Sequence, residues 1–320
     1  MDRLVAGRQR LRNYSSKYSR HDFTLAQLFA CLVVRELLGL SYRKLEAFLL
    51  DAPDWIAELG MTRVPDHNTL CRASAQLLKD PLVKRLLDEQ IALAADARML
   101  GLSCKPLAID SSMYESHHVS RHFELRRSRA ARKHKKGRKS RRNLTVRSLP
   151  KLALAVDCRS HMALSLWTGT GMGSDSPQFE QLLFDAWRRV ANKRFKVVAD
   201  AGYDGEHNHE LARNDMGLGS IIPATVGRTP RNDDRVRTRW RRRMRRQLKT
   251  KRSRRRCGYT QRWQVETANS MMKRNLGSAL RGKANQSRMR DLRLKVLTHN
   301  LMILRRREDR DRAGRHPSCQ

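Results

Sequence analysis

The chain has 320 residues and a formal charge of +37, because 68 lysines and arginines outnumber 31 acidic residues. Its hydrophobic content of 39% is enough to bury a core, which excludes a purely disordered basic tail protein. A folded protein with this excess of positive charge needs a polyanionic partner. Nucleic acid is the partner that the composition favours.

The N-terminal segment and the cysteines indicate the compartment. The first twenty residues are basic and contain no apolar core of a signal peptide. The most apolar stretch, FTLAQLFACLVVRELLGL, carries Arg35 and Glu36 in its middle, so we expect neither secretion nor a membrane span. The six cysteines are scattered without any CxxC pair, which fits reduced thiols in a cytoplasm.

Two segments invite a metal-site interpretation that their spacing does not support. Cys104 with His117, His118 and His122 offers thiol and imidazole ligands, but the spacing matches no usual zinc pattern. The tetrapeptide HNHE at His207 invites comparison with a histidine nuclease motif. It follows a strand and a turn directly, so we interpret it as the start of a helix.

Residues 1–100 have the pattern of a helical domain. The sequence predicts helices over 22–38, over SYRKLEAFL with Ser41 as the N-cap, after Pro65 and over 81–99. Short helices with tight turns are typical of a helix-turn-helix, in which SYRKLEAFL or HNTLCRASAQL offers polar side chains to DNA. Any small helical bundle has the same pattern, so both interpretations stay open.

The period of the apolar residues changes after Gly101 from helical to strand-like. KPLAID predicts one strand, and KLALAVDCRSHMALSLWTG predicts a hairpin. SDSPQFEQLLFDAWRRV predicts a helix with Ser176 at its N-cap, and FKVVAD predicts a buried strand. The other predicted elements of this α/β domain, over 101–305, are a helix over 207–215, a strand GSIIPA, a helix from Tyr259 and a final helix over 288–305. A basic tail follows at 306–320.

Two basic runs interrupt the α/β domain. Residues 126–142 carry eleven Lys or Arg, and residues 235–256 carry fourteen with no acid among them. We expect neither run to pack in a core, because such runs are typical of solvated arms that bind phosphate backbones without reading sequence. Trp240 in the second run either stacks on a base or anchors the arm.

Three acids occupy positions that suit chemistry. Asp110 in KPLAIDSS and Asp200 in FKVVADAGYDGE each end a predicted strand, and Glu266 lies in a predicted helix. Strand ends carry the chemistry of α/β sheets, although an aspartate there also starts turns. Carboxylates of this kind suit Mg²⁺ or Mn²⁺, and two such ions about 3.5–4 Å apart support phosphodiester cleavage.

The helix around Glu266 carries a polar stripe. On an ideal helix Tyr259, Arg262, Glu266 and Lys273 fall within one quadrant. A core-facing stripe lies roughly a quarter turn away and consists of Val265, Ala268, Met272 and Leu276. The plain interpretation is a solvated face with an Arg262–Glu266 pair at i,i+4.

These motifs together resemble bacterial insertion-sequence transposases of the DDE type. The family signature YxxRxxxExxxxxxK is matched at every fixed position by Tyr259, Arg262, Glu266 and Lys273. The family's DxGYD is present at 200–204. SYRKLEAFL and RVPDHNTLCRA are similar to the family's N-terminal helices, so the resemblance spans about residues 22 to 305.

The resemblance implies a ribonuclease-H-like mixed sheet with flanking helices and a metal-dependent activity. It makes Asp110, Asp200 and Glu266 the catalytic residues and the ligands of two Mg²⁺ or Mn²⁺ ions. Water would cut the phosphodiester at the element's end, and the released 3′-hydroxyl would then attack target DNA. No nucleotide cofactor is implied, since transesterification exchanges one phosphodiester for another, and GTGMGS at 169–174 lacks the residues of a P-loop.

The resemblance also implies roles in DNA contact. Arg262 and Lys273 would grip phosphates near the cut, and Tyr259 would orient a phosphate or stack on a base. Tyr203 and Asp204 would support the metal ligands from behind, or only shape the turn. The implied partner is double-stranded DNA, bound by a homodimer in a bacterial cytoplasm.

Two rival functions share the same residues. A ribonuclease-H-like nuclease would cut without joining, and a relic transposase would bind DNA without either step. Some relatives insert a large β-rich domain between the second aspartate and the glutamate. Here the 66-residue separation of Asp200 and Glu266 holds a helix, a short strand and the arginine run.

Overall fold

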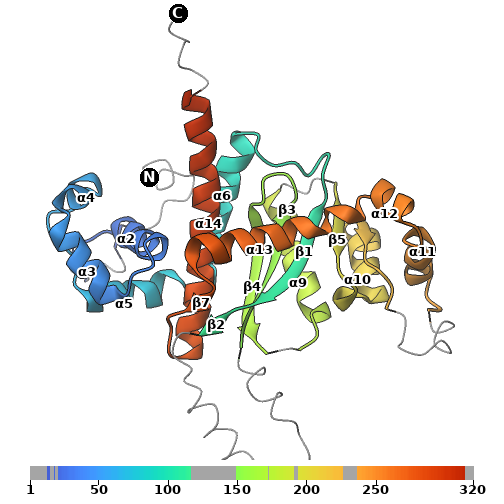
Figure 1. Cartoon of the computed structure of the whole chain (residues 1–320), viewed down its shortest axis with the longest axis horizontal. Coiled ribbons are helices and arrows are strands. Elements are labelled where there is room, and N and C mark those ends of the chain that lie inside the picture. The colour runs from blue at the N-terminus through green and yellow to red at the C-terminus, as the bar shows by residue number, and fades with distance from the viewer. Residues whose placement is uncertain are drawn as a thin grey trace, which may run out of the picture. The chain divides into compact units, whose positions relative to one another are not determined.

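The structure, a computed structural model, describes most of the chain. The described residues are 13–14, 18, 21–116, 149–171, 173–190, 194–225 and 236–313. They form two compact units (Figure 1), one with the N-terminal helices and the long C-terminal helix, and the other with the main β-sheet. The run 126–142 and the three histidines at 117, 118 and 122 lie outside the described residues.

Helices dominate the first unit. Their bounds are α2 (Leu25–Leu37), α3 (Tyr42–Asp51), α4 (Pro53–Glu58), α5 (His67–Leu77) and α14 (Asn285–Ala313), while α6 (Asp80–Asp96) begins in this unit and ends in the other. The predicted cap of α3 is confirmed, because Ser41 accepts a hydrogen bond from the backbone of Lys44 at 3.2 Å. Thr24 and Gln27 form a reciprocal capping box on α2, and Asp66 caps α5.

The charged pair inside the apolar run of α2 is buried against α14. Arg35 Nη2 lies 3.3 Å from Asp291 Oδ1, and Lys295 Nζ donates to Glu36 Oε1 at 2.6 Å. Removing one partner of such a pair leaves a buried charge, so the two pairs fix how α2 and α14 match. In the described chain no single helix is long and apolar enough to cross a membrane, although α2 and α3 pass that test as a pair bent by 103°.

The second unit is built on a five-stranded mixed sheet of order β4-β3-β1-β5-β6. The strands are β1 (Leu107–Met113), β3 (Pro150–Asp157), β4 (Ala163–Thr170), β5 (Lys196–Ala199) and β6 (Gly219–Ile221). The predicted hairpin is confirmed, since β3 and β4 pair antiparallel. β1 also pairs antiparallel with β3, whereas β1, β5 and β6 run parallel to one another. Two short strands, β2 (Glu115–Ser116) and β7 (Ala279–Leu280), lie outside this sheet.

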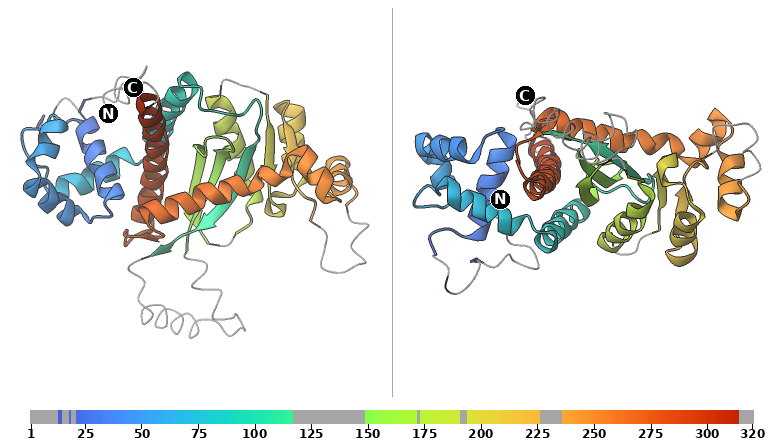
Figure 2. Two further views of the ribbon diagram at one scale, coloured as in Figure 1. Left: turned by 45° about the horizontal axis from the view of Figure 1, so that its top comes forward. Right: turned by 90° about the horizontal axis from the view of Figure 1, so that it is seen from below.

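Helices cover both faces of the sheet, which explains why the central part of its strands is buried and largely apolar. Every residue of β3 is buried, as are Val197, Val198 and Ala199 of β5. Helix α13 (Trp263–Leu276) lies on one face, and α9 (Phe179–Arg189) and α10 (Glu206–Glu210) lie on the other, as Figure 2 shows in its right panel. The predicted mixed sheet with flanking helices after a helical N-terminal region is thereby confirmed.

The arginine run forms two helices, α11 (Arg239–Gln247) and α12 (Lys251–Cys257), next to the β6 edge of the sheet. The prediction that this run cannot pack is wrong. Trp240, Met244, Leu248 and Cys257 are all at least 91% buried. The first three recur at every fourth position, so they share one helical face and leave the arginines on the others.

Several predicted elements differ from the observed ones in their bounds. The helix predicted from Ser176 begins as a 3-10 turn over Ser176–Gln178 with Asp175 as its N-cap residue. The helix predicted over 207–215 consists of α10 and a wider π-type turn over Leu211–Asp215. The final helix is longer than the predicted 288–305, because α14 runs on through the start of the expected tail.

Candidate active site

The parallel pairing of β1 with β5 brings two aspartates together. Ile109 pairs with Ala199, and Asp110 and Asp200 are the next residues along the two strands. Neighbouring strands lie about 4.8 Å apart, so the two carboxylates start from adjacent backbone positions. The prediction that Asp110 ends its strand is wrong, because β1 continues to Met113 by pairing with β3.

Each aspartate also binds the backbone beside it. Asp110 Oδ1 accepts a hydrogen bond from the N–H of Ser111 at 2.8 Å, and Asp200 Oδ1 accepts one from Gly202 at 2.8 Å. A Cβ on residue 202 would lie 3.0 Å from Asp200 Oδ1, so glycine leaves room for this carboxylate. The turn-forming role and a ligand role are compatible, because these backbone bonds occupy only the Oδ1 atom of each carboxylate.

Helix α13 brings a third acid and a cation to the aspartates. Its predicted core stripe is confirmed by the burial of Val265, Ala268, Met272 and Leu276. Arg262 ends a 3-10 turn over Tyr259–Arg262, just before α13 begins. It forms the predicted ion pair with Glu266, and its Nη1 also lies 3.6 Å from Asp110 Oδ2. The guanidinium therefore bridges two acids, which an ordinary solvated pair does not do.

Burial makes Asp110 difficult to ionise. The pKa of Asp110 rises to about 6, chiefly because the carboxyl group is desolvated, and the charges of Asp200 and Glu266 raise it further. The N–H of Ser111 and the charge of Arg262 act in the opposite direction. Three acids with one shared arginine are short of positive charge, which is the electrostatic condition of a site that takes up cations.

A fourth acid, Asp175, lies beside this group and was not predicted. Ser111 Oγ donates to Asp175 Oδ1 at 3.1 Å, so the residue after Asp110 links the two. Lys151 forms an ion pair with Asp175 and donates to the carbonyl of Gly173 at 3.0 Å. The Lys151 side chain is only 5% exposed. The one sequence signal was a lysine at the start of the otherwise apolar KLALAV.

Comparison with known families matches both parts of the chain. A model described as "Transposase DDE domain" matches residues 105–301, which is more than half of the chain and includes all three acids of the site. The chain belongs to the DDE transposase family. A second model, "Transposase domain (DUF772)", matches residues 1–76, and the search of curated proteins finds no match.

The family confirms the class of enzyme and of fold. DDE transposases are polynucleotidyl transferases that act on DNA, and the mixed sheet of this transposase agrees with their ribonuclease-H-like domain. The predicted resemblance to insertion-sequence transposases is therefore confirmed.

DDE transposases generally use divalent metal ions, and the acids of this transposase suit them in part. Among the described residues, no three His, Cys, Asp or Glu side chains stand close enough together to hold a metal ion. Asp110 and Asp200 are hard oxygen donors on adjacent strands, which is the chemistry that Mg²⁺ and Mn²⁺ require. Glu266 is held by Arg262, and its side chain is 51% exposed. The donor set fits, provided that Glu266 exchanges its arginine for a cation.

Tyr203 and Asp204, which follow Asp200 in the chain, make different contacts. Tyr203 is fully buried, and its ring lies 6.1 Å from that of Phe179. Burial raises the pKa of Tyr203, and the charges of Asp175, Asp110 and Asp200 raise it further. Asp204 instead binds Arg241 with both oxygens at 2.8–3.0 Å, so it ties α11 to the turn after β5. Whether either residue supports metal ligands stays a prediction.

The predicted DNA-contacting residues of the transposase are spread along the chain. Tyr259 is half-buried, which raises its pKa even though Arg262 opposes the rise. Lys273 lies on α13, seven residues or about two turns beyond Glu266. Trp240 is 9% exposed with the guanidinium of Arg213 stacked on its ring at 4.5 Å, which favours anchoring over base stacking. DNA contact by these residues stays a prediction.

Proposed function

We propose that this chain is the transposase of an insertion sequence, and that it cuts DNA at the ends of its element and joins the freed 3′-hydroxyl to target DNA. The observation that carries the proposal is the register of β1 and β5, which makes Asp110 and Asp200 neighbours. Arg262, just before α13, forms ion pairs with Asp110 and with Glu266 on α13. These four residues come from three separate segments of the catalytic-domain match.

The three acids are the proposed metal ligands. Asp110 and Asp200 would hold the side of the site that the two ions share, and Glu266 would complete the ligand shell of the second ion. When bound, two Mg²⁺ or Mn²⁺ ions supply an activated water and stabilise the leaving oxygen of the phosphodiester. The raised pKa of Asp110 supports this role, because the carboxylate gains most from a neighbouring positive charge.

The chemistry consists of two displacements at phosphorus. In the first, a water oxygen bonds to the phosphorus at the element's end, the bond to the 3′-oxygen breaks, and that oxygen leaves as a 3′-hydroxyl. In the second, this hydroxyl bonds to a target phosphorus, and the target's own 3′-oxygen leaves. Each step forms one P–O bond and breaks another, so no nucleotide cofactor is required.

Arg262 is the proposed phosphate clamp. Its guanidinium already lies between Asp110 and Glu266, where the scissile phosphate would have to approach the acids. The arginine fork can bind two phosphate oxygens at once, and Tyr259 and Lys273 are proposed to orient the same strand. Tyr203 packs behind the turn that carries Asp200, where it would hold that aspartate in place.

The first experiment incubates purified protein with a labelled duplex that carries the element's end, with and without Mg²⁺. We expect 3′-hydroxyl cleavage and joined product from the wild type and neither from Glu266→Gln. Glu210→Gln is the matched control, because Glu210 is an exposed glutamate on α10 of the same unit, and it should leave both products unchanged.

The products also separate the rival functions. Cleavage without joining would identify a ribonuclease-H-like nuclease, and DNA binding without either product would identify a relic. If Glu266→Gln retained full activity, the assignment of the third acid would be wrong even though the family is known.

Three further parts of the proposal concern architecture. We propose that residues 1–100 bind DNA, that 101–305 form the catalytic domain and that a homodimer holds two DNA ends. The match of residues 1–76 to a transposase domain supports the first part. Light scattering with and without end DNA tests the last, and one protomer on each duplex would contradict it.

A further inference from the structure

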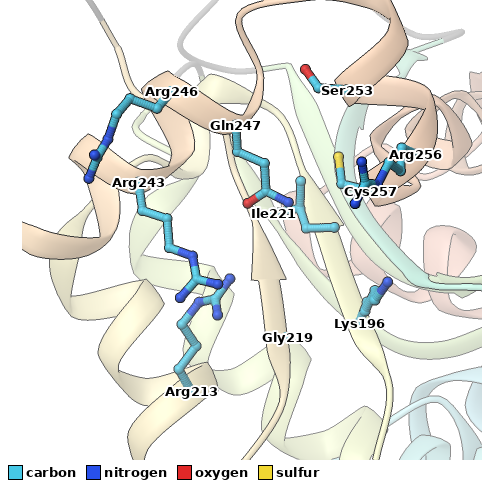
Figure 3. A pocket seen from close by; sticks show the side chains of 10 residues that line it. All are labelled: Lys196, Arg213, Gly219, Ile221, Arg243, Arg246, Gln247, Ser253, Arg256 and Cys257. Carbon is cyan, nitrogen blue, oxygen red and sulfur yellow. The ribbon is translucent and has the colours of Figure 1, made fainter.

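A basic pocket lies between the sheet edge and the two helices of the arginine run. Its volume is about 510 Å³. Figure 3 shows the side chains around it, which come from β5, β6, the turn after α10, α11 and α12. The lining residues that carry positive charge are Lys196, Arg213, Arg243, Arg246 and Arg256. The others are Gly219, Ile221, Gln247, Ser253 and Cys257, so no acid is among the described residues that line the pocket.

The positive charges of the pocket lack internal counter-ions. Within the described part of the chain, no ion pair joins any of the five basic lining residues to a carboxylate. In Figure 3 the guanidinium groups of Arg213 and Arg243 lie next to one another. Burial lowers the pKa of Arg213, and the charge of Arg243 lowers it further. Two adjacent guanidinium groups repel each other unless an anion joins them.

Arg213 is held rigidly, which distinguishes the pocket from a loose surface cluster. Its Nε donates to Ser220 Oγ at 2.8 Å and its Nη2 donates to the Ser220 carbonyl at 2.6 Å. Its guanidinium also stacks on the Trp240 ring at 4.5 Å. Arg243 approaches the same ring at 5.6 Å. The aromatic ring therefore positions the two arginines from one side.

Nearby acids are used to position α11 and do not enter the pocket. Glu206 accepts hydrogen bonds from the backbone N–H groups of Trp240 at 2.9 Å and Arg241 at 3.1 Å, so it caps the N-terminus of α11. Asp204 binds the Arg241 side chain. Both carboxylates thus bind at the start of the helix, whereas Arg243 and Arg246 further along it line the pocket.

We propose that this pocket binds a phosphate group of the DNA backbone, at a site separate from the three acids. The proposal rests on the proposed DNA-cutting function. Guanidinium groups match the paired oxygens of a phosphodiester, and Ser253 and Gln247 add neutral hydrogen-bonding groups.

The pocket lies near the active site along β5. Lys196 opens β5, and Asp200 follows its end four residues later. At about 3.3 Å per residue their Cα atoms are roughly 13 Å apart. One strand of DNA carries a phosphate about every 3.4 Å of helix axis, so the proposed phosphate site lies within a few nucleotides of the cut. The pocket would hold the strand that is being cut against sliding.

The test compares two double variants that remove equal charge from the same two helices. Arg243→Gln with Arg256→Gln removes lining residues from α11 and α12. Arg242→Gln with Arg255→Gln removes exposed arginines from the same helices that do not line the pocket. Binding to a short fluorescent duplex of arbitrary sequence is measured against salt without divalent metal. Each phosphate contact contributes about 0.9 to the slope of log affinity against log salt, so the lining pair, which loses one phosphate contact, should lower the slope by roughly 0.9 and the control pair by clearly less.

A local readout uses Lys196, which opens into the pocket, and Lys105, an exposed lysine of the same unit that does not. We expect DNA to slow the acylation of Lys196 in the wild type and in the control pair. In the lining pair, DNA should no longer slow it. Lys105 should not distinguish the variants. Equal slopes for the two pairs, or unprotected Lys196 in the wild type, would overturn the pocket proposal alone. A wild type that does not bind DNA would overturn the proposed function itself.

Discussion

The two ends of β5 carry opposite charge and handle it in opposite ways. At one end Lys196 opens into the basic pocket, and at the other Asp200 stands beside Asp110. The acidic end has cations of its own, since Arg262 bridges Asp110 and Glu266. At the basic end, the lining residues that the structure describes include no acid.

The difference fits what each end is proposed to bind. Small cations fit between carboxylates, and a neighbouring arginine can pair with those carboxylates while no cation is bound. A DNA phosphate is large and already charged, so internal acids would compete with it for the arginines. The basic end therefore holds its cations by an aromatic ring and a serine, which fix their positions without neutralising them. Each prediction below changes residues near one end of β5 only.

The largest effect is expected at the acidic end. Asp110→Asn should lower cleavage by at least about 10³-fold, the order of loss that follows removal of an acting catalytic group. Its melting temperature should be unchanged or higher. The pKa of Asp110 is raised to about 6, so above that pH the folded protein carries an unfavourably buried charge that asparagine removes.

Activity and thermal unfolding of Asp110→Asn, both measured at pH 7, check this prediction. A large fall in melting temperature together with the loss of cleavage would indicate a structural role for Asp110. Loss of cleavage with an unchanged or higher melting temperature would sharpen the comparison. It would show that the acidic end is less stable than it could be because it keeps a carboxylate for binding cations.

The next effect concerns Lys151, the buried lysine that pairs with Asp175. Lys151→Met should destabilise the fold by about 4 kcal/mol, because it leaves Asp175 without its partner in a largely buried pair. Adding Asp175→Asn should recover part of the loss, since the unpaired charge is then gone. Urea unfolding of the single and double variants measures both steps, and an unchanged wild-type midpoint in Lys151→Met would contradict the pairing.

The sequence predicted the acids better than it predicted how they meet. Periodicity and the family signature indicated Asp110, Asp200 and Glu266 in advance. The adjacency of the first two depends on the pairing of strands that lie about ninety residues apart, and no local pattern encodes that register. The Lys151–Asp175 pair was missed for the same reason, because an isolated lysine in an apolar strand does not indicate its partner.

The basic end was mispredicted because charge concealed a helical pattern. Fourteen basic residues over 235–256 suggested a solvated arm, yet Trp240, Met244 and Leu248 already have the spacing of one buried helical face. Three apolar positions were enough because Glu206 and Asp204 fix the start of α11 from outside the run. Those contacts are tertiary, so the run alone could not have revealed them.

A pH effect should reach the basic end through His209. Its Nδ1 lies 2.7 Å from Ser220 Oγ, the same hydroxyl that accepts a hydrogen bond from Arg213. Burial lowers the pKa of His209 to about 4, and the charge of Arg213 lowers it further. Between about pH 6.5 and 4 the unfolded chain binds a proton that the folded chain does not. Stability should therefore fall by roughly 3 kcal/mol as pH drops through this window.

Urea unfolding of the wild type and His209→Asn across that window isolates the contribution of His209. The variant should lack this part of the pH dependence, because asparagine can still accept from Ser220 and does not titrate. Parallel curves for the two proteins would show that His209 does not link acidity to the support of Arg213.

The smallest effect tests how α11 is attached. Arg241 binds Asp204 through two nitrogens, and its carboxylate partner is 3% exposed. Arg241→Lys keeps the charge but loses the fork, so we expect a loss of about 1–2 kcal/mol in the free energy of unfolding. Arg242→Lys is the matched control, because Arg242 is exposed on the same helix and should change little. Arg241 does not line the pocket. Weaker DNA binding in Arg241→Lys alone would therefore mean that phosphate binding depends on where α11 is held. Equal binding in both variants would mean that the lining arginines bind their phosphate without that attachment.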